Sequence, residues 1–97
     1  MPEFHELKSS CIDLGHYAGK TKELTVHFVG KKSERFYRYS NIPVTIWEKL
    51  NLLSDSGGVG EYFNETVIRH PEKYPFKEVK IRSFTIIGRD KKAGDSK

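Results

Sequence analysis

The sequence is poor in cysteine and has no long hydrophobic run. Cys11 is the only cysteine among 97 residues, so no intramolecular disulfide can form. A domain this small without a disulfide framework is typical of a reducing compartment. The first residues lack the basic stretch and apolar run of a secretory signal, and no apolar segment approaches the roughly 20 residues of a membrane-spanning helix. We therefore expect a cytoplasmic protein.

Residues that carry catalysis or bind metals are few and dispersed. The four histidines are scattered along the chain, at His5, His16, His27 and His70. Cys11 and His16 supply one candidate pair of metal ligands, whereas a structural zinc site needs four. His27 falls on the polar side of an alternating segment and is predicted to face solvent. These observations favour a binding protein over an enzyme, with no cofactor and no metal.

Charged and aromatic residues are, by contrast, abundant. Lys and Arg number 17 against 13 Asp and Glu, and this net charge of +4 favours polyanionic partners without specifying one. The length suits a single domain, and six Phe, five Tyr and one Trp can supply its core. We expect this domain to span residues 1–88. Residues 89–97 contain no apolar side chain larger than that of Ala93, which predicts a disordered basic tail.

The hydrophobic pattern first has the period of strands. Ile12 and Leu14 alternate with a polar residue and lead to Gly15, which predicts a first strand that closes in a turn there. Residues 24–28 alternate strictly and residues 35–39 are rich in aromatics, as strands are. Short polar turns join these segments. They therefore predict an antiparallel meander.

The period then becomes helical. From Pro43 onward, Ile46, Trp47, Leu50 and Leu53 follow helical spacing, and proline suits a helix start. A second helix is predicted over about residues 59–69, and residues 79–87 predict a fourth strand with a bulge. The expected fold is α+β: an antiparallel three- to four-stranded sheet with two helices packed on one face. Six residues are expected in the core: Leu24, Val26, Phe28, Trp47, Leu50 and Phe63.

Glycines separate the two predicted helices. Gly57, Gly58 and Gly60 flank the predicted start of the second helix, where exposed amides can hold an anion. The Gly-Lys-Ser/Thr ending that makes a nucleotide-binding loop specific is missing. A tight turn with glycines at unusual backbone angles is the favoured interpretation.

The segment from residue 31 to residue 39 combines positive charge with aromatic side chains. Four cations and two tyrosines form the candidate nucleic-acid-binding set: Lys31, Lys32, Arg35, Tyr37, Arg38 and Tyr39. Cations hold phosphates and aromatic faces stack on unpaired bases, so this mixture suits single-stranded nucleic acid. It also suits a structural role, in which tyrosines fill the core while arginines keep the sheet soluble. In a strand, Tyr37 and Tyr39 share one face and Arg38 lies on the other.

Several short motifs in order resemble a known family. They are Ser9-Ser10-Cys11-Ile12-Asp13-Leu14-Gly15, Leu24-Thr25-Val26-His27-Phe28, Tyr37-Arg38-Tyr39, Ile42-Pro43, Gly60-Glu61-Tyr62-Phe63-Asn64 and Ile68-Arg69. Over about residues 8–74 this order resembles the KTSC domain, named for its occurrence at the C-terminus of some lysyl-tRNA synthetases. The family also occurs as small standalone proteins in bacteria and phages. The resemblance implies RNA binding, with tRNA as one candidate ligand. The alternative is a protein–protein module, for instance a phage-encoded inhibitor that docks a host protein.

Overall fold

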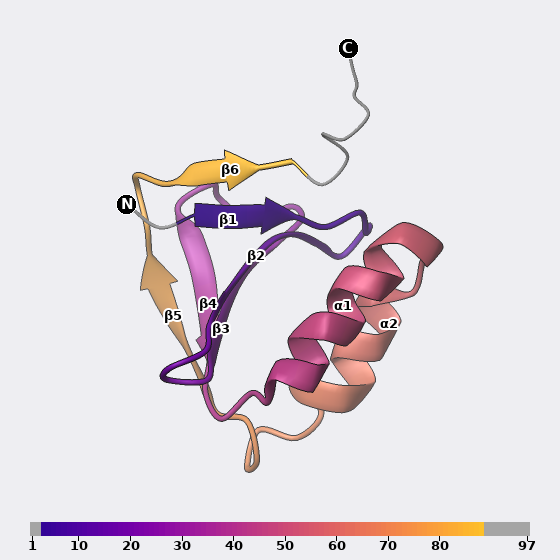
Figure 1. The fold of residues 1–97 in the computed structure, drawn as a ribbon. Helices are drawn as coiled ribbons and strands as arrows, with labels where there is room; N and C mark the ends of the chain where they lie inside the picture. The colour runs from indigo at the N-terminus through magenta and orange to yellow at the C-terminus, as the bar shows by residue number, and fades with distance from the viewer. Residues whose placement is uncertain (1–2, 89–97) are drawn as a thin grey trace.

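A computed structural model describes residues 3–88 of the chain (Figure 1). The elements in order are β1 (Glu3–Glu6), β2 (Ile12–Ala18), β3 (Glu23–Phe28), β4 (Arg35–Tyr39), α1 (Val44–Ser56), α2 (Val59–Phe63), the π-helix η1 (Asn64–Ile68), β5 (Phe76–Lys80) and β6 (Thr85–Ile87). The predicted tail at residues 89–97 lies outside the described residues. Within residues 3–88, no helix has the length and apolar character needed to cross a membrane.

The strands form one six-stranded sheet in the order β5-β4-β3-β2-β1-β6. All neighbouring strands are antiparallel except β1 and β6, which pair in parallel. The α+β class and the β2–β3–β4 meander are therefore confirmed, whereas the expected three to four strands are six. The strand predicted at residues 79–87 is in fact two: β5 pairs with β4 at one edge of the sheet, and β6 pairs with β1 at the other edge.

The prediction of a turn at Gly15 is wrong. Gly15 lies inside β2, which continues to Ala18, and the chain turns at residues 19–22, in one of the short polar turns expected between the strands. A packing contact gives the reason for this glycine: a Cβ atom at Gly15 would lie 3.0 Å from Cζ3 of Trp47. The glycine thus makes room for the indole ring of α1 rather than bending the strand.

The two predicted helices are confirmed. α1 begins directly after Pro43, and the segment from α2 through η1 is one continuous helical run over residues 59–68. Gly57 and Gly58 between the helices have φ angles of 100° and 98°, values that glycine adopts without a Cβ clash. This geometry agrees with the interpretation of the glycine-rich segment as a tight turn.

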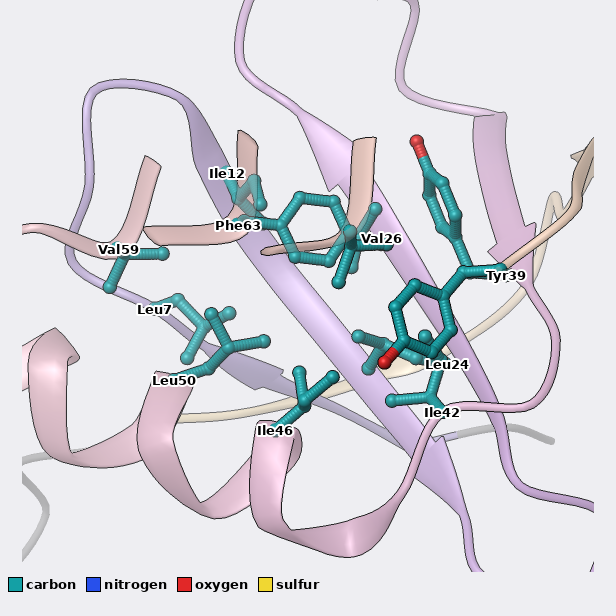
Figure 2. Close-up of a cluster of buried hydrophobic side chains, with 12 residues drawn as sticks. Leu7, Ile12, Leu24, Val26, Tyr39, Ile42, Ile46, Leu50, Val59 and Phe63 are labelled. Carbon is teal, nitrogen blue, oxygen red and sulfur yellow. The ribbon is translucent and has the colours of Figure 1, made fainter. Parts of the chain in front are cut away.

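The main core lies between the helices and the sheet. Leu24, Val26, Leu50 and Phe63 are buried there as expected, whereas Phe28 and Trp47 are only partly buried at its margin. Figure 2 shows side chains of α1 pointing toward the strands in this cluster. Both helices lie side by side on one side of the molecule (Figure 1).

The opposite face of the sheet is also packed, which the expectation of single-face packing did not include. Phe4, Leu14 and Phe36 form a second buried cluster, to which Phe84 adds an edge-on ring. The rings of Phe4 in β1 and Phe36 in β4 have centroids 4.7 Å apart, although two strands lie between them in the sheet. Because neighbouring strands are about 4.8 Å apart, such a contact requires a strongly curved sheet. The sheet therefore wraps around this cluster.

This second cluster overturns the prediction that His27 faces solvent. The side chain lies on the second face of β3 and the residue is only 7% exposed. Its Nδ1 lies 2.8 Å from Oδ1 of Asp13, its Nε2 lies 2.9 Å from the backbone oxygen of Lys32, and its ring contacts Phe36. The strict alternation of β3 identified the two faces correctly, but the polar face is covered by the curved sheet.

Candidate nucleic-acid interface

The register of β4 divides the candidate residues between two faces of the sheet. Tyr39 lies opposite Leu24 and Tyr37 lies opposite Val26, so both tyrosines are on the helix side. Arg38 alternates to the second face, where its cross-strand partner is Thr25. The six predicted residues therefore do not form one continuous patch.

Tyr39 is a core residue. It is 4% exposed, and its ring makes an edge-on contact with Phe63 at a centroid distance of 5.2 Å. Burial of the hydroxyl raises the pKa of Tyr39 to about 12, with smaller contributions from Tyr37 and Cys11. Tyr39 offers no ring face to a base, which leaves Tyr37 as the candidate stacking tyrosine.

Tyr37 forms part of an aromatic row at the open margin of the helix side. It is partly buried, with ring centroids 5.3 Å from Phe28 and 6.0 Å from Phe76. Phe76 is the first residue of β5, lies opposite Tyr39 and is 53% exposed. A large aromatic side chain that is half exposed beside another aromatic ring is suited to stacking on a base.

Sequence reasoning missed Phe76. The segment from Pro71 to Phe76 carries no periodic signal, and only pairing of β5 with β4 brings Phe76 beside Tyr37. One feature could have indicated a strand there: an aromatic residue directly after Pro75.

The lysines of the turn between β3 and β4 are exposed, as a phosphate-binding role requires. Lys31 donates its backbone N–H to the oxygen of Phe28, and the backbone oxygen of Lys32 lies 2.9 Å from Nε2 of His27. The turn is thus anchored on a buried side chain. Neither lysine side chain has an ion-pair partner within residues 3–88.

Arg35 is less available. Its Nε lies 2.7 Å from Oε2 of Glu78 on β5, and both side chains are about half exposed. An ion pair of this exposure stabilises a fold by only about 0–1 kcal/mol. A phosphate could compete for the guanidinium, but Glu78 already compensates the charge of Arg35 before any phosphate binds.

Arg38 and Lys77 form a separate basic site on the second face. The two residues lie directly opposite each other in β4 and β5. They line a shallow hollow of about 210 Å³ together with Glu23, Ser40, Pro75 and Phe76. Phe76 therefore contributes both to this hollow and to the aromatic row.

A curved, mostly antiparallel sheet with two helices on one side, and with exposed aromatic and basic side chains at its β4–β5 edge, defines a small α+β domain. The chain belongs to the KTSC domain family, whose model matches residues 8–70. This match runs from just before β2 through η1, so β1, β5 and β6 lie outside it. Comparison with curated proteins gives no match. Phe76 and Lys77 are consequently features of this chain beyond the matched region.

Proposed function

We propose that this protein is a small non-enzymatic RNA-binding domain of a cytoplasmic, standalone bacterial or phage type, with tRNA among its candidate ligands. The observation that carries the proposal is the contact between the rings of Tyr37 and Phe76. Phe76 is half exposed and lies at the edge of the sheet, near exposed lysines. Exposed rings stack on unpaired bases, and this contact tolerates any base because each has a π-face.

The charge distribution supports the same ligand. Exposed lysines lie at both ends of the β4–β5 edge: Lys31 and Lys32 precede β4, whereas Lys77 lies beside its end. These three lysines have no ion-pair partner among the described residues. Neutralising phosphates with such side chains releases counterions and supplies affinity that does not depend on sequence. A single-stranded RNA lying along the β4–β5 edge would meet Lys31 and Lys32 at one end, and Lys77 and the exposed ring of Phe76 at the other.

A protein partner is the second candidate, and the position of β5 favours it specifically. β5 is an edge strand of the sheet, paired on one side with β4. An extended peptide can add to such an edge, with Phe76 as an apolar anchor. A phage-encoded inhibitor that docks a host protein would fit this arrangement.

Salt dependence separates the two candidates. We would measure fluorescence anisotropy with labelled tRNA and single-stranded RNA at low and near-physiological salt. Binding through phosphates weakens steeply as salt rises, whereas an apolar interface does not. Lys31→Ala with Lys32→Ala should weaken binding to all RNA sequences alike. For each phosphate that is no longer neutralised, the slope of log affinity against log salt should also flatten by about one unit or slightly less.

The matched control is Lys49→Ala, which removes an exposed lysine from α1 without touching the β4–β5 edge. This variant should retain both the affinity and the salt slope. Circular dichroism confirms that each variant is folded. Absence of RNA binding even at low salt would refute the proposal and favour a protein partner.

A further inference from the structure

We propose that the hollow beside the end of β4 is a phosphate-binding subsite, formed by Arg38, Lys77 and Ser40. This inference deepens the proposed function, on which it rests for the expected source of the phosphate, the RNA backbone. The same chemistry would also hold a free phosphate monoester. The site lies on the opposite face of β4 from Tyr37 and is distinct from the Lys31–Lys32 turn.

The first observation is a pair of like charges. Arg38 and Lys77 are direct cross-strand partners, so their side chains leave the same face of the sheet side by side. Like charges in this position destabilise a sheet. Neither side chain has a carboxylate within ion-pair distance among residues 3–88. An anion bound between them would remove this repulsion.

The second observation is that Arg38 is held in place. Its Nε donates a hydrogen bond of 3.1 Å to Oγ1 of Thr25, a residue that is only 2% exposed. This hydrogen bond uses one N–H of the guanidinium and leaves the terminal nitrogens to face a ligand. A guanidinium oriented in this way can bind two phosphate oxygens at once, whereas the lysine adds a point charge.

The third observation is the composition of the hollow. Ser40 adds a hydroxyl, and its backbone N–H donates to the oxygen of Pro75, which ties the two sides of the hollow together. Phe76 also lines the hollow, although its ring contacts Tyr37 and Tyr39 on the helix side of the sheet. The hollow therefore offers two cations and a hydroxyl to a phosphate group.

Glu23 also lines the hollow and carries negative charge. Its Oε1 accepts a hydrogen bond from Oγ1 of Thr21 at 3.2 Å, and it forms no ion pair with Arg38 or Lys77. With Glu23 ionised, the formal charge of Glu23, Arg38 and Lys77 together is still positive. A carboxylate in this place can accept a hydrogen bond from a ribose hydroxyl, the group that distinguishes RNA from DNA.

The test is an NMR titration of the full chain with three probes: inorganic phosphate, uridine 5′-monophosphate and a short oligouridylate. We expect each probe to shift the backbone amide signals of residues 38–40 and 75–77 in a saturable way. Lys77→Gln should weaken binding of the monophosphate about tenfold, because the variant lacks one charge-assisted hydrogen bond to the phosphate. Lys80→Gln is the control: it removes the same charge from the same strand but from the helix side.

The outcomes separate the subsite from the proposed function. If oligouridylate binds and Lys77→Gln leaves both its affinity and the phosphate shifts unchanged, the subsite is refuted while RNA binding stands. If inorganic phosphate and the monophosphate bind at residues 38–40 and 75–77 but no RNA binds, the subsite stands and its ligand is a free phosphate monoester. Equally weakened binding in Lys77→Gln and Lys80→Gln, or no shifts with any probe, would overturn the subsite.

Discussion

Gly60 packs so closely against Cys11 that a Cβ atom placed on Gly60 would lie 2.7 Å from the Cβ of Cys11. Real Cβ atoms do not approach so closely, so the backbone at the start of the second helix packs directly against the side chain of Cys11, the residue before β2. On the strand side, Oγ of Ser9 accepts hydrogen bonds from the backbone N–H groups of Cys11 and Ile12, at 3.0 and 3.4 Å. This turn and this glycine together fix the second helix on the sheet.

Gly60→Ala should therefore destabilise the fold, because α2 or the turn before β2 must shift. The expected decrease is about 1–3 kcal/mol in the free energy of unfolding, the usual cost of overpacking, measured by denaturant titration. Gly19→Ala is the control, since its nearest contact would be Tyr17 at 3.9 Å, an ordinary distance. Equal stability of the two variants would show that the second helix is placed differently.

Leu50 and Leu52 allow a comparison within a single helix. Leu50 is fully buried in the main core, whereas Leu52 is 68% exposed. Leu50→Ala should cost about 2–5 kcal/mol, and Leu52→Ala should remain within about 0.5 kcal/mol. Denaturant melts of both variants measure the difference, and similar costs would mean that the buried face of α1 is assigned wrongly.

The buried His27 depends on Asp13 for one of its two polar contacts. Asp13→Ala leaves Nδ1 of a side chain that is 8% exposed without its partner, which should lower the free energy of unfolding by about 1–3 kcal/mol. His70 and Glu72 form a similar pair at 3.7 Å on the surface. Glu72→Ala should thus cost less than about 0.5 kcal/mol. A cost of Asp13→Ala as small as this would indicate that water replaces the carboxylate.

Tyr39 gives the stability a dependence on alkaline pH. Its pKa is raised to about 12 in the folded state against an ordinary 10.0, so the unfolded chain releases this proton first as pH rises. The contribution of the protonated Tyr39 hydroxyl to the free energy of unfolding is complete below pH 10 and disappears as pH rises toward 12. Between pH 9 and pH 11, Tyr39→Phe should lose about 1 kcal/mol less stability than the unmodified chain. Parallel decreases in the two proteins would contradict the burial of this hydroxyl.

Local patterns in the sequence predicted the β2–β3–β4 meander and both helices, because each has a periodicity that can be recognised within one segment. β1 and β6 have four and three residues, too few for such a pattern. They are stabilised by pairing with each other and by the contact of Phe4 with Phe84, which is 80 positions away in the chain. The curvature that buries His27 follows from these distant contacts, so the exposure of that face could not be inferred locally.

The candidate site was predictable only in part, for a related reason. Alternation in β4 separates Tyr37 from Arg38, but aromatic residues occur on both faces of the strand, so the pattern alone did not show which face is open. The helices cover Tyr39 and leave Tyr37 at the margin. Phe76 and Lys77 reach the site through the pairing of β5 with β4, two strands that are separated in the chain by both helices.

The measurement that tests RNA binding most directly compares Phe76→Ala with Leu52→Ala in anisotropy titrations against single-stranded RNA. Both variants remove an exposed apolar side chain, but only Phe76 lies beside Tyr37. Phe76→Ala should cost about 1–3 kcal/mol of binding free energy, the range for one stacked base, with little change in salt slope. Leu52→Ala should bind as the unmodified chain does. Equal affinities for the two variants, or no binding by the unmodified chain at low salt, would contradict the account.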